Sequence, residues 1–342
     1  MDWTPLHAHI HHTLRRSKPS PLGHSSPSLV LGPLLPPGAS LLVAVSGGQD
    51  SLCLLRLLVD LRTQWGWSLR VCHGDHRWRT DSAENAAFVA QLAADWGLPC
   101  DVVTADLPPA SEAAARTWRY GELGQVALAH GCTHVVTGHT ASDRAETLLH
   151  NLMRGSGTDG LQALTWQRPL GTVAPGVTLA RPLLGITRAQ TAAFCQDQHL
   201  PIWEDRTNQE RTYARNRIRL DLLPQLQTFN PQVEMALAQT AEVLTAEVAY
   251  LEAECDRLES TCLQWQPPHL HRPSLQALPL ALQRRLVRRF LGRLLPRQGS
   301  FDQVEKLVAL ITAPNRSQTD PFSGGAIARV EGDWICWLEP LV

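Results

Sequence analysis

Six residues near position 50 have the types and spacing of a phosphate-binding turn. The run Ser46-Gly47-Gly48-Gln49-Asp50-Ser51 combines two glycines, two hydroxyls and one carboxylate. The glycines let the backbone bend sharply and bring its N–H groups close to an anion. A carboxylate beside phosphates usually implies Mg²⁺, so Asp50 is the expected metal ligand. An ordinary glycine-rich turn is the alternative. The common P-loop is excluded, because its lysine is missing from this run.

A second polar cluster follows Gly138. Asp143 and Glu146 are three positions apart, so their carboxylates share one face of a helix. His139 precedes them, where an imidazole can act as a base or contact a nucleobase. The alternative is a helix start whose acidic residues only suit the helix dipole. The cluster is therefore a candidate site for acid–base chemistry or nucleobase contact.

Several arginines have spacings suited to phosphate. Arg116 and Arg119 share one helix face and could neutralise phosphates in place of a lysine, or form a solvated face. Four arginines occur between 211 and 219, where an ordinary surface helix is the alternative. A later helix carries five arginines on one face, without an interrupting carboxylate. The residues expected to contact nucleic acid are Arg215, Asn216, Arg217, Arg219, Arg285 and Arg289.

Alternating strands and helices must position these residues. The patterns predict strands at 41–45, 68–73, 100–105 and 134–138, a short one at 201–203, and helices at 52–61, 82–96, 111–130, 142–153 and 187–199. This order is typical of an α/β fold with a doubly wound, mainly parallel, Rossmann-like sheet. Ligands of such sheets bind at the carboxyl ends of the strands, where the polar clusters fall.

The rest of the sequence suggests that the chain has three parts. Residues 1–37 are rich in proline and histidine and are expected to be a disordered extension, followed by a catalytic domain at 38–224. Residues 225–342 predict a smaller helical domain that ends in a β-hairpin. Its helices are expected at 233–262, 278–294 and 301–312, and the hairpin strands at 325–330 and 334–338.

Composition indicates an ordinary globular protein. The formal net charge of −1 argues neither for nor against a nucleic-acid partner. The eight cysteines form no Cys-x-x-Cys pair and are expected to be core thiols in a reducing compartment. With no membrane span or signal peptide visible, a cytoplasmic location without membrane attachment is expected.

Together these stretches resemble the tRNA(Ile)-lysidine synthases, within the PP-loop (N-type) ATP pyrophosphatases. The likeness covers residues 39–226 strongly and the later helices more weakly. It rests on Ser46–Ser51, His73-Gly74-Asp75-His76, Glu112…Arg116…Arg119-Tyr120, Gly138-His139…Asp143…Ala145-Glu146-Thr147, Arg181-Pro182-Leu183-Leu184 and Asp205…Thr207-Asn208…Arg215-Asn216-Arg217-Ile218-Arg219.

The resemblance implies a reaction of ATP, L-lysine and the wobble cytidine of tRNA(Ile) with a CAU anticodon, which gives lysidine, AMP and pyrophosphate. The loop Ser46–Ser51 and Arg119 would bind ATP, with Mg²⁺ at Asp50. Arg116 would offset developing negative charge. Asp143 and Glu146 would orient the lysine amine or bind metal, and His139 would serve as base or substrate contact.

Two departures from the family pattern leave other functions open. Ser142-Asp143-Arg144 stands where family members usually have Asp-Asp-Gln, and a further C-terminal domain of longer members is not expected here. One alternative is a tRNA-thiolating relative, although the cysteine spacing offers no obvious catalytic pair. An amidotransferase-type relative is a less suitable alternative, because it would need an ammonia-supplying segment and none is visible in the sequence. Another alternative is a non-catalytic nucleotide or RNA binder. The oligomeric state is also open, a homodimer included.

Overall fold

The computed structural model describes residues 3–15, 17–18, 32–203, 211, 214–296 and 299–340. The chain divides into two compact units, Met1–Val248 and Ala249–Val342. Their boundary falls inside helix α10 (Val233–Cys262), further along than the expected boundary at 224. Pro224 lies in the first turn of α9 (Leu223–Phe229), where its missing N–H costs no helical hydrogen bond.

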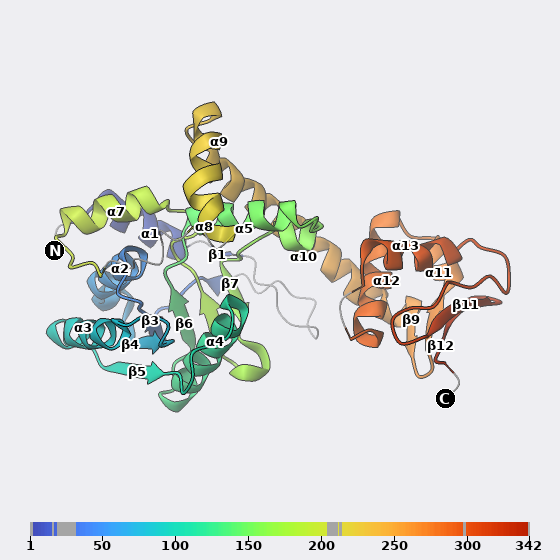
Figure 1. The fold of residues 1–342 in the computed structure, drawn as a ribbon, viewed down its shortest axis with the longest axis horizontal. Coiled ribbons are helices and arrows are strands. Elements are labelled where there is room, and N and C mark those ends of the chain that lie inside the picture. Colours follow the sequence, from blue (N-terminus) through green and yellow to red (C-terminus); the bar gives the residue numbers. More distant parts are fainter. Residues whose placement is uncertain are drawn as a thin grey trace. The chain divides into compact units, whose positions relative to one another are not determined.

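The first unit is built on a six-stranded sheet of order β5-β4-β3-β6-β8-β7 (Figure 1). All neighbouring pairs are parallel except β7 with β8, which confirms the predicted mainly parallel α/β fold. The strands are β3 (Ser40–Ala44), β4 (Ser68–Asp75), β5 (Cys100–Thr104), β6 (His134–Thr137), β7 (Gln167–Pro169) and β8 (Thr178–Ala180).

Helices cover both faces of this sheet because its strands are apolar on both sides. Leu41 and Val43 pack in one core with α1, α2, α3 and α7, while Leu42 packs in another with α4. The helices of this unit are α1 (Pro5–Arg15), α2 (Gln49–Trp65), α3 (Ser82–Asp95), α4 (Glu112–Ala129), α5 (Ala141–Met153), α6 (Thr158–Leu161), α7 (Arg188–Asp197), α8 (Ala214–Arg217) and α9, with the 3₁₀ turn η1 (Gly171–Val173) and the π-helical η3 (Ile218–Leu222).

Three local expectations were wrong. The chain from Pro5 to Arg15 forms helix α1 rather than a disordered segment, because Ile10 and Leu14, four residues apart, are fully buried on one face. Residues 201–203 are irregular rather than a strand. No strand was expected between 154 and 183, but this stretch contains β7 and β8, whose three residues each give too little periodicity to detect. The resemblance residues Asp205, Thr207 and Asn208 lie outside the described residues.

The second unit packs helices against an antiparallel sheet of order β11-β12-β10-β9. The hairpin β11–β12 and helices α12 and α13 were predicted, whereas β9 and β10 were missed. Its elements are the end of α10, β9 (Leu263–Trp265), β10 (Pro268–His271), α11 (Arg272–Gln276), α12 (Leu280–Leu294), α13 (Phe301–Leu310), β11 (Ile327–Glu331) and β12 (Trp334–Leu338). Within the described ranges, no helix combines the length and apolarity that a bilayer crossing requires.

Candidate active site

The loop between β3 and α2 turns tightly at the carboxyl edge of the sheet. Gly47 has a φ of +84°, and a Cβ there would lie 2.6 Å from the side-chain oxygen of Asn85. Gly48 caps α2 without a side-chain hydrogen bond. Ser51 Oγ donates to the Gly48 carbonyl at 2.8 Å and accepts the Ser46 N–H at 3.2 Å. This geometry places backbone N–H groups at a helix N-terminus, where an anion is favoured.

Gln49 and Asp50, in the first turn of α2, contact α7. Gln49 Nε2 donates to the Arg188 carbonyl and to Thr191 Oγ1, each at 2.8 Å. The Thr191 hydroxyl donates to Asp50, and Arg188 Nε lies 3.4 Å from the other Asp50 oxygen. The side chain of Gln49 therefore ties α2 to α7, which differs from its expected contact with ATP, whereas Asp50 faces the site.

Asp143 and Glu146 lie in the first two turns of α5. Asp143 Oδ2 accepts from the Thr140 N–H at 2.8 Å and from its hydroxyl at 2.9 Å, which closes a capping box. Glu146 is fully buried. Gly138 lets the starts of α2 and α5 approach, because a Cβ there would lie 2.8 Å from the Asp50 carbonyl oxygen. The carboxylates are thus fixed before any ligand arrives.

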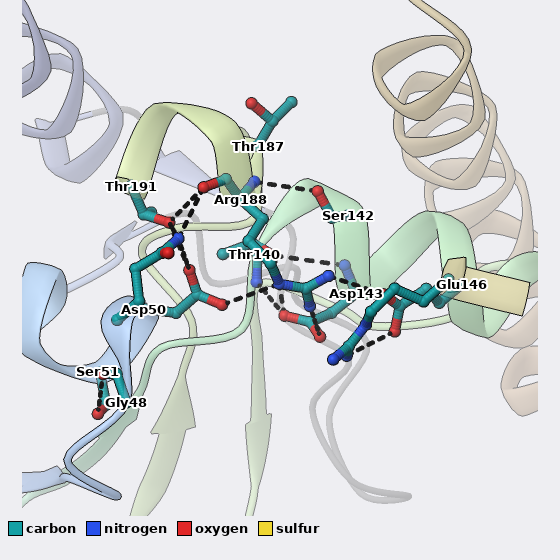
Figure 2. Close-up of polar contacts among 12 residues, drawn as sticks. Gly48, Asp50, Ser51, Thr140, Ser142, Asp143, Glu146, Thr187, Arg188 and Thr191 are labelled. Atoms are coloured by element: carbon teal, nitrogen blue, oxygen red, sulfur yellow. Dashed lines mark hydrogen bonds and ion pairs between the residues drawn. The ribbon is translucent and has the colours of Figure 1, made fainter. Parts of the chain in front are cut away.

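Arg188, the first residue of α7, joins the two carboxylate-bearing helices (Figure 2). Its guanidinium nitrogens lie 3.4 Å from Asp50, 3.0 Å from Asp143 and 2.9 Å from Glu146. The three carboxylates therefore share one site, as the sequence predicted. Arg188 itself was missed. Its signal was the Thr187-x-x-Gln190 capping box, which starts a helix at the ligand-binding edge of the sheet.

Two further arginines face the same carboxylates. Arg215, on α8, lies 2.9 Å from both Asp143 and Glu146, and Arg219, on η3, lies 2.8 Å from Glu146. With Arg188 they set three guanidinium groups against three carboxylates. This inward position differs from the nucleic-acid contact expected of Arg215 and Arg219.

Burial and ion pairing shift the carboxylate pKa values in different directions. Burial alone would raise the pKa of Asp143, but Arg215 and Arg188 outweigh it and hold that pKa well below its usual range. Burial also opposes ionisation of Glu146, and its arginine partners again lower the pKa. For Asp50 burial dominates and the pKa is raised. Asp143 and Glu146 are therefore ionised at neutral pH, where they can attract a positively charged amine.

His139 follows β6, close to these groups. Its Nδ1 lies 2.9 Å from the Thr137 hydroxyl. Burial, with a further contribution from Arg181, lowers the pKa of His139 to about 3. A histidine that stays neutral so far into acid is a weak proton acceptor at pH 7. The structure thus favours substrate contact over the role of base.

Arg116 and Arg119 lie on α4 and make no ion pair with the site carboxylates. The Arg116 guanidinium carbon is 5.4 Å from the centroid of the Tyr120 ring. Arg119 donates to Nε2 of His76 at 2.9 and 3.1 Å. Both arginines are exposed, which leaves them accessible to a nucleotide.

Ser142 and Arg144, the departures from the family pattern, contact helix α10. Ser142 donates to Glu234 and accepts the backbone N–H of Arg188 at 3.0 Å. Arg144 is 1% exposed and donates to Glu242 at 2.8 Å. These residues are packing contacts, so they give no support to the idea that the site has been lost.

The arginines of α12 are paired within their own unit. Arg285 donates to Glu252, and Arg289 pairs with Glu252, Asp256 and Glu259. These partners come from α10, so the sequence of α12 alone could not reveal them. Arg285 and Arg289 therefore have no support as nucleic-acid contacts.

Metal binding by protein ligands alone is not indicated. Among the residues that the structure describes, no group of three or more His, Cys, Asp or Glu side chains could hold a metal ion. A single carboxylate such as Asp50 nevertheless fits Mg²⁺, which takes most of its ligands from phosphates and water.

The fold and the loop together define a PP-loop domain, and residues 31–226 match the family model of that description. The structure is similar to that of the U34-tRNA thiolase NcsA from Methanococcus maripaludis with its 4Fe-4S cluster. The TM-score is 0.55 at 15% identity, over 70% of this chain and 76% of the other. At this identity the likeness shows the fold alone.

Sequence comparison defines the family more narrowly. Residues 270–333 match the TilS substrate binding domain. The chain is 54% identical to a tRNA(Ile)-lysidine synthase from a Nostoc species, over 98% of this chain and 97% of the relative. A chloroplastic tRNA(Ile)-lysidine synthase from Zygnema circumcarinatum is 36% identical, over 83% and 78%. The chain belongs to the tRNA(Ile)-lysidine synthase family.

Proposed function

We propose that this protein is an ATP-dependent ligase that joins L-lysine to C2 of the wobble cytidine in tRNA(Ile) with a CAU anticodon. The observation that supports this most is that Arg188 forms ion pairs with all three carboxylates. It thereby brings Asp50 of the loop Ser46–Ser51 (the phosphate loop) next to Asp143 and Glu146 of α5. A nucleotide triphosphate on the loop and an amine at the carboxylates would meet there.

The first step activates the cytosine. Its O2 attacks the α-phosphate of ATP, an adenylated cytidine forms and pyrophosphate leaves. The N–H groups of Gly47 and Gly48, with the hydroxyls of Ser46 and Ser51, would hold the pyrophosphate. Mg²⁺, held by Asp50 and the phosphates, would supply charge neutralisation when bound.

In the same step, negative charge develops on the transferring phosphoryl group. Arg116 and Arg119, exposed on α4, would offset that charge.

The second step forms the carbon–nitrogen bond. The ε-ammonium of lysine first loses a proton to water, and the neutral amine attacks C2. AMP leaves with the bonding electrons of the C2–O2 bond, and a second proton passes from the new C–N group to water. Asp143 and Glu146 would attract the ammonium, which must compete with the arginines that now pair with them. His139, neutral at pH 7, would contact the cytosine or the lysine.

The tRNA presents the cytidine in a single-stranded loop, where turning one base out of the stack costs comparatively little. Arg217 is exposed and Asn216 is half-buried on α8, and both stay predicted RNA contacts. A homodimer and a cytoplasmic location also stay predictions.

One assay tests the proposal. The protein is incubated with ATP, each amino acid in turn and a CAU-anticodon tRNA(Ile) transcript, and digested nucleosides are analysed by mass spectrometry. Of the amino acids tested, only lysine should give a modified cytidine, which is lysidine. A CAU-anticodon tRNA(Met) transcript should stay unmodified. Absence of any modified cytidine would contradict the proposal.

A further inference from the structure

Three arginines gather around one tyrosine, next to the carboxylate site. The guanidinium carbons of Arg116 and Arg168 lie 5.4 and 5.0 Å from the ring centroid of Tyr120. Burial opposes ionisation of the same tyrosine, yet Arg181 lies close enough to its side chain for the arginine charge to lower the pKa of the Tyr120 hydroxyl. These four residues, the Tyr120 cluster, come from α4, from β7 and from the residue after β8, and so from separate parts of the chain.

The positive charge of the Tyr120 cluster is not balanced by a carboxylate in the part of the chain that the structure describes. Among the described residues, none of its three arginines forms an ion pair with a carboxylate, whereas Arg188, Arg215 and Arg219 all do. Phosphate is the anion that planar guanidinium groups bind best.

Arg181 supplies a second, independent observation. It is 1% exposed, and its Nη1 donates to the Thr165 carbonyl at 2.6 Å, yet its buried Nε has no hydrogen-bond partner. A buried cation without a carboxylate is costly unless an anion compensates for it. The Tyr120 cluster therefore has the character of an anion-binding site.

A phosphate bound by this cluster could belong to ATP or to the tRNA, and the position of β7 favours the tRNA. In the strand order β3-β6-β8-β7, the strand that carries Arg168 is three places from the strand that leads into the phosphate loop. That is about 14 Å at the usual strand spacing. The phosphates of ATP are expected at the loop itself. A polynucleotide whose cytidine enters the site continues past it in both directions, and arginine beside an aromatic ring is a common platform for unstacked nucleotides.

We propose that Arg168, on the β7 side of the Tyr120 cluster, binds a phosphodiester of the tRNA anticodon loop next to the target cytidine, whereas Arg116 keeps its role at the transferring phosphoryl group. The inference rests on the proposed function and adds a substrate contact to it. Arg181 orients Tyr120, and Tyr120 in turn orients Arg168 at the edge of the sheet.

The test compares Arg168→Gln with Arg62→Gln, which removes the same charge from an exposed position in the last turn of α2. Binding of a CAU anticodon stem-loop is measured at several salt concentrations, and binding of ATP separately. Arg168→Gln should weaken RNA binding about tenfold and lower the salt slope by about one, with ATP binding unchanged. Arg168→Lys should restore part of the affinity, because it keeps the charge.

Two results would overturn the inference. If Arg168→Gln weakens ATP binding but not RNA binding, the phosphate belongs to the nucleotide. If it behaves like Arg62→Gln in both measurements, the cluster is no anion site. Measuring lysidine formation by the wild-type protein distinguishes failure of this inference from failure of the proposed function. A protein that makes lysidine while Arg168→Gln binds RNA normally contradicts the inference alone. A protein that makes none contradicts the proposed function, and the RNA measurements still decide the inference.

Discussion

At the scale of single residues, Asp143 shows how firmly the site is fixed. Its two oxygens accept from the backbone N–H and hydroxyl of Thr140 and from the guanidinium groups of Arg188 and Arg215. These contacts require the ionised form of the carboxyl group. Asp143 therefore stabilises the fold as well as serving the proposed chemistry.

Asp143→Asn should lower the free energy of unfolding by about 3 kcal/mol at pH 7, because Arg188 and Arg215 lose a buried partner. The folded-state pKa of Asp143 lies below its unfolded value. The stabilisation is therefore complete above about pH 4 and is lost as the pH falls towards the folded-state pKa. Urea denaturation at pH 7 and pH 3 checks this, and an equal difference between variant and wild type at both values would contradict it.

Gly138 is a second residue whose role follows from its position. A Cβ at this residue would lie 2.8 Å from the carbonyl oxygen of Asp50 and 3.1 Å from Cα of Ser51. Gly138→Ala should therefore destabilise the fold by about 1–3 kcal/mol and weaken ATP binding, because only movement of the α2 start makes room. Gly121→Ala, inside α4 with open space around it, is the control and should be neutral or stabilising. Unchanged ATP affinity in Gly138→Ala would refute this account.

The sequence predicted individual site residues unevenly. Asp50, Asp143 and Glu146 were found because carboxylates at strand ends and helix starts have a local pattern. Arg188 was missed because it comes from a helix some forty residues beyond α5, and only the folded sheet brings it there. Arg215 and Arg219 were assigned to RNA because their partners are distant in sequence.

At the scale of elements, α10 is joined to α5 by an ion pair between the buried Arg144 and the partly exposed Glu242. Arg144 donates to Glu242 at 2.8 Å and to Thr245 at 3.1 Å, and Trp166 Nε1 donates to the same Glu242 oxygen at 2.7 Å. A local sequence pattern could not reveal this contact, because Arg144 and Glu242 are 98 positions apart in the sequence.

Glu242→Gln should lower the free energy of unfolding by about 2 kcal/mol, because it leaves the buried Arg144 cation without a counter-charge. Glu247→Gln, an exposed position on the same helix, makes the same chemical change and should have little effect. Chemical denaturation of both variants is the measurement. Equal stability of the two would show that the Arg144–Glu242 pair does not hold α10 to α5.

In helix α12, the structure shows ion pairs for arginines that were expected to contact nucleic acid. Its arginines pair with acidic residues of α10, and Arg289 alone contacts three of them. Arg289→Ala should destabilise the protein by about 2 kcal/mol and leave the salt dependence of tRNA binding unchanged. Thermal unfolding and a salt titration of tRNA affinity test the two parts. A reduced salt slope with normal stability would return Arg289 to the nucleic-acid contacts.

At the scale of the whole chain, the mainly parallel sheet was predictable because buried parallel strands are continuous apolar runs flanked by helices. Helix α1 was not, since prolines and histidines around it hid the spacing of Ile10 and Leu14. The short strands β7 and β8 pair with each other, and β8 also pairs with β6, which follows from the fold and not from their own sequence. Pairing between distant segments is the information that local patterns lack.

The central claim is that the phosphate loop and the carboxylates of α5 act on one reaction. The most direct test is pyrophosphate and AMP release from ATP with a CAU-anticodon tRNA(Ile) transcript and lysine, for Asp50→Asn and Glu146→Gln. Asp50→Asn should release neither product, while Glu146→Gln should still release pyrophosphate and require far more lysine to release AMP. Normal release of both products by folded Asp50→Asn would contradict the claim.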